Sequence, residues 1–320
     1  MKKILLGLLV TGAVGGVAFY ATNAFFSDTE TSTGNTLQAG AIDLKVDNTC
    51  YYNGQACTQG PDDRFYWGGL PNHPSPTPAT NLCSCTWKSK NLEEGDLFFD
   101  IEDIKPGDWE EDTISLTVEN NEAWLCADVH LTSDDDVTCT EPESETGLAD
   151  PECSAPTPSP GTGELADRVR FLWWADDGDN VLETCEFPNA PPDCKEETTL
   201  PSGPLGVLNV SQTAHVTLAD SNKNLWSGLP NDPIPQGGDT WYIGKGWCFG
   251  RITETPVPQD GLGPTIPITN GPDSPRGGGF TCDGSGEGNE TQTDRLTAEI
   301  SFRAEQARNN EDFLCNPRPL

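Results

Sequence analysis

"TISLTVEN" (residues 113–120) and "AWLCADVHLT" (residues 123–132) decide the fold class of this chain. In both stretches apolar and polar residues alternate, which is typical of strands with one buried face. The first stretch puts Ile114, Leu116 and Val118 on one face, and the second repeats the pattern with alternate residues from Ala123 to Leu131. The two stretches therefore predict half-buried strands.

The same alternation recurs along the chain, in residues 37–46, 168–175, 213–220, 241–250 and 295–306. No stretch shows a convincing helical stripe. The pattern predicts an all-β protein, a jelly-roll-type β-sandwich with long disulfide-rich loop insertions.

The predicted insertions are rich in Pro, Gly and Cys and cover residues 47–94, 138–163, 184–204 and 254–291. None has an apolar core of its own, so we expect residues 37–320 to form a single decorated sandwich domain.

The N-terminus has the form of an export signal. Lys2 and Lys3 precede an apolar run, and Thr22 and Ala24 are small residues suited to a cleavage site. Residues 1–24 are therefore predicted to be a signal peptide. An uncleaved membrane anchor is the alternative, since the apolar run is long enough to span a bilayer. Both place the rest of the chain outside the cytoplasm, in the extracellular space or on the cell surface.

Cysteine number and charge agree with export. The chain has 12 cysteines, an even number that favours disulfides over metal binding, although spacing does not give the pairing. Its formal net charge is −33. This negative charge argues against binding to nucleic acids and to anionic lipids, which are also negatively charged. We therefore expect contact with a membrane only through the signal segment. The same charge favours the binding of divalent cations.

"WWADDGDNVLE" (residues 173–183) is the candidate metal site. Carboxylate and amide oxygens around a glycine turn suit Ca²⁺. The predicted ligands are Asp176, Asp177, Asp179, Asn180 and Glu183, and Asp134, Asp135 and Asp136 are candidates for further ligands. A solvated acidic turn without an ion is the alternative interpretation.

The sequence argues against an enzyme. Its histidines are His73, His130 and His215, and no H-E-x-x-H, H-x-x-E-H or G-x-S-x-G motif occurs. Even-numbered cysteines disfavour a free catalytic thiol. We therefore predict no catalytic activity.

"ATNAFFSDTETSTGNTLQAGAIDLKV" (residues 21–46) closely resembles the start of the TasA/camelysin family of exported fibre proteins. "DIKPGD" (103–108), "LTVENN" (116–121) and "ISFRAEQARNN" (300–310) extend the resemblance. Within "KPGD", Pro106 presets φ and Gly107 permits positive φ, which predicts a turn before the next strand.

The resemblance implies an exported structural subunit of a fibre or biofilm matrix, with a signal peptide that a SipW-type signal peptidase processes. Its partners would be copies of itself or related subunits. Residues 25–36 would add a strand to the next subunit, with Phe25 and Phe26 as anchors in an apolar groove. The alternative for this segment is a terminus folded onto its own sandwich.

Two other functions remain open at this stage. One is a monomeric calcium-binding surface adhesin, whose contact surface would be the related loops "WGGLPNHP" (67–74) and "WSGLPNDP" (226–233). The other is a camelysin-like metallopeptidase, which the small number of histidines disfavours.

Overall fold

The structure, a computed structural model, describes residues 27–31, 42–69, 81–144, 161–185, 197, 199–204, 212–261, 271–274 and 276–316. Strands dominate these ranges, and α2 (Leu165–Arg168) is a single helical turn. The predicted all-β class is confirmed. No helix in the described ranges is long and apolar enough to cross a membrane.

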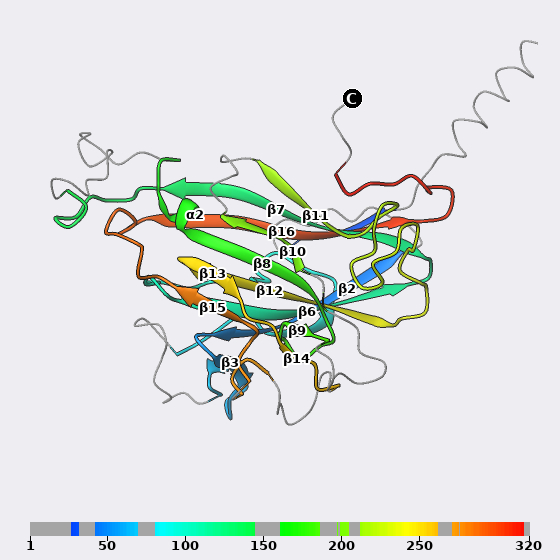
Figure 1. The fold of residues 1–320 in the computed structure, drawn as a ribbon, viewed down its shortest axis with the longest axis horizontal. Coiled ribbons are helices and arrows are strands. Elements are labelled where there is room, and N and C mark those ends of the chain that lie inside the picture. The colour runs from blue at the N-terminus through cyan, green and yellow to red at the C-terminus, as the bar shows by residue number, and fades with distance from the viewer. Residues whose placement is uncertain are drawn as a thin grey trace, which may run out of the picture.

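Two antiparallel sheets form the body of the molecule (Figure 1). The larger sheet contains, in spatial order, β10 (Thr199–Pro204), β8 (Val169–Asp176), β12 (Thr240–Phe249), β6 (Trp109–Glu119), β2 (Asp43–Tyr52), β3 (Gln55–Gln59) and β4 (Phe65–Trp67), with β5 (Trp87–Lys90) also paired to β2. The smaller sheet contains β1 (Ser27–Thr31), β16 (Arg295–Gln306), β7 (Ala123–Asp135) and β11 (Thr213–Ala219).

Two short strand pairs complete the described structure. They are β13 (Arg251–Glu254) with β15 (Phe280–Asp283), and β9 (Glu183–Thr184) with β14 (Val257–Pro258).

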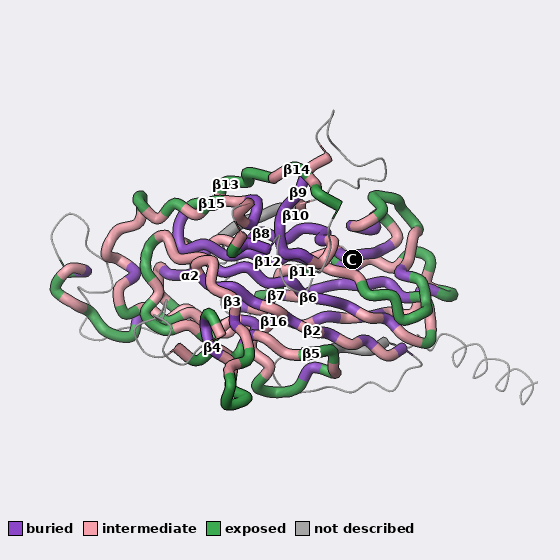
Figure 2. Tube along the Cα trace, turned by 90° about the horizontal axis from the view of Figure 1, so that it is seen from below, coloured by how far each residue is buried: buried purple, intermediate pink, exposed green. Residues whose placement is uncertain are grey.

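The core lies between the two sheets, where the alternation predicted it. Ile114, Leu116 and Val118 of β6 are buried in one cluster with Leu125 and Val129 of β7. Figure 2 shows the buried positions concentrated in the central strands of the molecule. The predicted inward faces of these strands are therefore correct.

The insertions are more ordered than predicted. Residues 47–94 contain the end of β2 and all of β3, β4 and β5. Residues 184–204 contain the end of β9 and all of β10, and residues 254–291 contain the end of β13 and all of β14 and β15. These strands are mostly two to six residues long, too short for alternation to stand out from the surrounding Pro and Gly.

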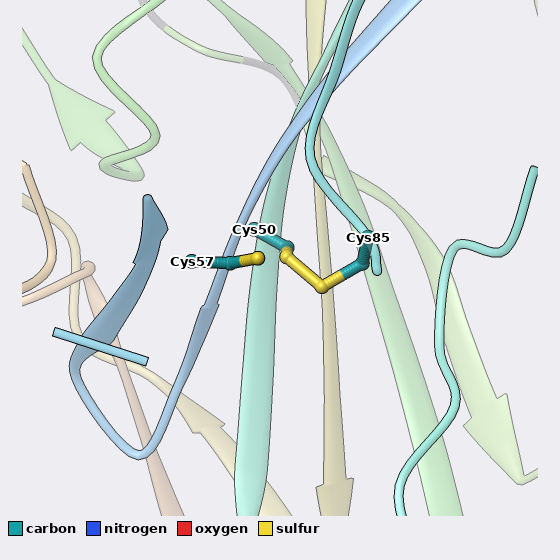
Figure 3. Close-up of side chains that lie close together, drawn as sticks. All are labelled: Cys50, Cys57 and Cys85. Carbon is teal, nitrogen blue, oxygen red and sulfur yellow. A yellow bond between two sulfur atoms is a disulfide. The ribbon is translucent and has the colours of Figure 1, made fainter. Parts of the chain in front are cut away.

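Where both partners are described, four cysteine pairs lie at disulfide-bonding distance. The Cα–Cα separations are 5.8 Å for Cys50–Cys85, 5.9 Å for Cys57–Cys83, and 5.5 Å for both Cys126–Cys315 and Cys248–Cys282. These values match ordinary disulfides. Figure 3 shows the Cys50–Cys85 bond with Cys57 beside it. No cysteine of the described ranges is free, which supports disulfides over metal ligation.

The predicted "KPGD" turn is confirmed. Gly107 has φ of 94°, and the Asp108 amide donates to the Lys105 carbonyl at 2.9 Å. The Tyr52 hydroxyl donates to Asp108 Oδ2 at 2.6 Å, which fixes the turn against β2. Strand β6 begins directly afterwards at Trp109.

Replacing Gly244 with alanine should destabilise the larger sheet. Gly244 lies opposite Trp174 on the neighbouring strand β8, and a Cβ at this position would overlap the buried indole. We expect the free energy of unfolding to fall by about 1–3 kcal/mol, the usual effect of overpacking. Urea denaturation measures it. Gly286→Ala is the matched control because a Cβ there meets nothing within 4 Å. Equal midpoints for both variants would contradict the prediction.

Candidate cation site on the outer face of the larger sheet

The face of the larger sheet that points away from the sandwich core is also covered. Leu172 and Trp174 of β8 form a second small apolar cluster there with Leu182, and Ile252 of β13 and Phe280 of β15 pack against it. This cover buries polar groups that the alternation alone would leave in solvent. Glu111 of β6 is one of them, at 1% exposure.

Asp176 shapes the loop that follows β8. Its Oδ2 accepts hydrogen bonds from the amides of Gly178 (3.0 Å) and Asn180 (3.2 Å), and its Oδ1 accepts one from Trp174 Nε1 (3.1 Å). Gly178 and Asn180 have φ of 110° and 61°. Glycine and asparagine tolerate such angles, so the sequence "DDGDN" suits this tight loop.

The loop brings three of the predicted ligands close to one another. Asp177, Glu183 and Glu197 each offer a carboxylate oxygen within 4.8 Å of the others, and so do Asp179, Glu183 and Asp260. Glu197 also accepts the amides of Asp177 (3.1 Å) and Glu183 (2.7 Å), which ties it to both ends of the loop.

Negative charge exceeds positive charge at this place. Among the described residues, Arg276 is the basic side chain that pairs with these carboxylates: Asp179 (3.4 Å), Asp260 (2.6 Å) and Glu183. Asp177 Oδ1 and Glu183 Oε2 are buried and accept no hydrogen bond from the part of the chain that the structure describes. The acidic groups gathered here are Glu111, Asp176, Asp177, Asp179, Glu183, Glu197 and Asp260.

Burial raises the pKa of the Glu111 and Asp177 carboxyl groups. It raises the pKa of Asp176 and of Glu183 to about 7, and that of Glu197 to about 11. For Asp179, burial and then the nearby charge of Asp176 raise the pKa to about 10. The site therefore retains protons near neutral pH unless a cation replaces them. Its carboxylate oxygens are the donors that Ca²⁺ prefers, so the residues present fit this ion.

The predicted ligands differ in how their side chains are placed at the site. Asp177, Asp179 and Glu183 converge, whereas Asp176 is occupied by main-chain amides. The Asn180 side chain is buried, and neither of its polar atoms has a hydrogen-bond partner among the described residues. It is available as an amide-oxygen ligand.

Asp134, Asp135 and Asp136 do not join this site in the described contacts. Asp134 Oδ1 accepts the Ala166 amide at 3.4 Å, and Asp135 pairs with Arg295 at 3.2 Å. Both belong to strand β7 of the smaller sheet, and no described contact joins them to the carboxylate site.

Glu197, Asp260 and Arg276 were not predicted as residues of this site. They come from the Pro- and Gly-rich stretches 184–204 and 254–291, where no periodicity marks a side chain as buried. The outward position of Glu111 was predictable from the sequence. Glu111 alternates with the inward residues of β6, so its side chain must point to the opposite face of the sheet.

The remaining candidate residues lie elsewhere. His130 Nδ1 contacts Thr213 Oγ1 at 3.0 Å and His215 Nδ1 contacts Asp128 Oδ1 at 2.6 Å, both on the smaller sheet. Phe25, Phe26 and His73 lie outside the described residues.

The two related tryptophans pack against the protein itself. Trp67 is buried against Tyr52, with ring centroids 5.7 Å apart. Trp226 meets Trp241 edge-on at 5.2 Å, and its indole donates to the Tyr242 carbonyl at 2.6 Å. Both indoles therefore serve the fold, which weakens the case for an aromatic contact surface.

Comparison with models of protein families, with curated proteins and with solved structures gave no match.

Proposed function

We propose that this chain is an exported structural subunit of an extracellular fibre or cell-surface matrix, without catalytic activity and similar to the TasA/camelysin family. Its body would be a decorated jelly-roll-type sandwich, and assembly would use the N-terminal segment. The observation that best supports the proposal is the position of β1 at the edge of the smaller sheet. The disulfide-distance cysteine pairs agree with an oxidising, extracellular setting.

Strand β1 covers only part of an open edge. Strand β16 pairs with β7 from Arg295 to Gln306, but with β1 only from Ser301 to Glu305. Along Arg295–Glu299, β16 has β7 as its one strand partner in the described part of the chain. Such an edge can accept further main-chain hydrogen bonds from an added strand.

The pairing between β1 and β16 is antiparallel and runs through the main chain, from Ser27 opposite Glu305 to Thr31 opposite Ser301. A strand of the same sequence from a second copy could pair with the same main-chain groups of β16. Exchange of an identical element between copies is a low-cost route to assembly. The arrangement is therefore compatible with both a closed single chain and a polymer.

The test compares mature protein beginning at Phe25 with protein beginning at Leu37, by negative-stain electron microscopy and size-exclusion chromatography. We expect fibres only from the longer protein. Adding a peptide of residues 25–36 to the shorter protein should give capped monomers, because the peptide occupies the β16 edge without offering a second one.

A point variant separates strand pairing from simple truncation. Thr29→Pro removes one main-chain donor from the centre of β1 and should reduce fibre formation strongly. Thr29→Val keeps the donor and the strand preference, and should assemble as the natural protein does. Fibres from the protein beginning at Leu37, or no fibres from folded protein beginning at Phe25, would contradict the proposal.

A monomeric calcium-binding adhesin is the second candidate, and the carboxylate site is the observation that favours it. Calcium binding with no assembly, and with no effect of removing residues 25–36, would support this function instead. Calcium binding together with fibres would place the ion in the structural subunit.

A further inference from the structure

A charged group of side chains lies inside the sandwich core. On β6, Glu110 and Asp112 occupy the same inward face as Ile114, and on β12 Lys245 occupies the same inward face as Ile243. Glu110, Asp112 and Lys245 are all 0% exposed. Lys245 lies directly opposite Asp112 in the register of the two strands.

The three groups are in contact. Lys245 Nζ contacts Asp112 Oδ2 directly and lies 3.3 Å from Glu110 Oε2. Asn48 Nδ2 donates to Asp112 Oδ1 at 2.8 Å, and Trp247 Nε1 donates to Glu110 Oε2. Each of the three charged side chains is thus held in place by a neighbour on another strand.

The surroundings are apolar. The rings of Phe99 and Phe171 lie over Lys245 Nζ, with centroids 5.5 Å and 5.8 Å away. A buried ammonium and two buried carboxylates are expensive to keep charged in such a place. Proton transfer from the ammonium to Asp112 gives an amine facing a carboxylic acid, with fewer charges to bury.

The protonation behaviour of the carboxyl groups agrees with this. Burial raises the pKa of Glu110 to about 8 and also raises the pKa of Asp112. Burial lowers the pKa of Lys245, but the two carboxylates outweigh it and raise that pKa for as long as they are charged. Neutralising the carboxylates removes this effect, so a proton can be shared among the three groups.

We infer that Lys245 and Asp112 condense spontaneously to an intramolecular isopeptide bond, with Glu110 as the proton carrier. The bond would join the central strands β6 and β12 covalently. It requires no cofactor, oxidant or reductant, because an amine and a carboxylic acid form an amide and release water.

The neutral Nζ of Lys245 attacks Cγ of protonated Asp112, and the Glu110 carboxylate accepts a proton from the nitrogen. Glu110 then returns the proton to the hydroxyl on Cγ, the C–O bond breaks, and water leaves. Asn48 Nδ2 donates to the oxygen that remains as the amide carbonyl and would stabilise the charge on it in the tetrahedral intermediate. Fixed contact between the reacting groups replaces a bimolecular encounter.

A buried ion pair without a covalent bond is the competing interpretation, and mass separates the two. The experiment measures the intact mass of the mature, unsubstituted protein after reduction and alkylation, with its N-terminus determined by sequencing. We expect a mass one water below that of the linear chain. Protease mapping should recover a branched fragment that contains both Asp112 and Lys245. A full linear mass with no branched fragment would overturn the inference.

Single substitutions test the roles of Lys245, Asp112 and Glu110 in bond formation. Lys245→Met and Glu110→Gln should show the full linear mass, whereas Glu111→Gln, the matched control on the opposite face of β6, should still lose water. Asp112→Asn should lose ammonia in place of water if it reacts. Water loss in Glu110→Gln would overturn the role of Glu110. If a variant fails to fold, the branched fragment of the unsubstituted protein decides the bond itself.

Discussion

Replacing Lys245 with methionine is expected to lower the free energy of unfolding by about 3–5 kcal/mol at pH 8, because two buried carboxyl groups lose the lysine nitrogen that contacts them. Lys245 contacts both Glu110 and Asp112 in the core. Without it, two carboxyl groups remain buried with no cation, although methionine fills most of the space. Guanidinium chloride denaturation of the two proteins measures the difference in the free energy of unfolding.

The loss should depend on pH. Without Lys245 the folded protein binds protons on Glu110 and Asp112 more tightly than the unfolded chain does, so its stability falls as pH rises from about 4 towards 8. The variant Glu110→Gln/Asp112→Asn/Lys245→Met is the control. It removes every charge of the group and should recover much of the stability. A single Lys245→Met variant that matches the natural protein at pH 8 would contradict the prediction.

Calcium should stabilise the protein, and more strongly at pH 8 than at pH 5. Without a cation, Asp176 and Glu183, whose pKa is raised to about 7, bind protons more tightly in the folded state than in the unfolded state. This stabilisation is present at low pH and is lost as pH rises through about 7. Ca²⁺ binds the deprotonated groups and offsets the loss.

At calcium about 100-fold above the dissociation constant, the gain is about 2.7 kcal/mol, which corresponds to a rise in Tm of roughly 4–5 °C for a domain of this length. Differential scanning calorimetry with chelator or calcium at both pH values measures it. Asp177→Asn and Glu183→Gln should reduce the calcium effect, whereas Glu254→Gln, an exposed residue outside the site, should leave it unchanged. Equal Tm with chelator and with calcium at pH 8 would rule out the site.

The predictions succeeded where a long strand alternates. Ile114, Leu116 and Val118 share a face because of strand geometry alone, and their burial follows from their apolar character. The same alternation places Glu110 and Asp112 on the inward face of β6, yet charged residues give no sequence signal for burial. Their place in the core depends on Lys245, more than a hundred residues away, on a strand whose pairing is not readable from the sequence.

Some residues of the candidate cation site were likewise predictable from the sequence, and others were not. Asp176 to Glu183 stand together in the chain, so their proximity was predictable from the sequence. Glu197, Asp260 and Arg276 reach the site through the pairing of β9 with β14 and the packing of neighbouring segments. Such contacts depend on tertiary structure, which composition and spacing do not encode.

The Cys126–Cys315 bond determines how the molecule carries tension. It joins the segment after β16 to β7, across 189 residues of sequence. A pull on the chain beyond Cys315 therefore passes through a covalent bond into β7, and the segment between β16 and Cys315 stays slack. Strand β16 is then not peeled from its neighbours, and the load reaches β7, which is hydrogen-bonded to β16 on one side and β11 on the other. In reducing conditions the same pull would enter at Gln306 and open β16 from its end.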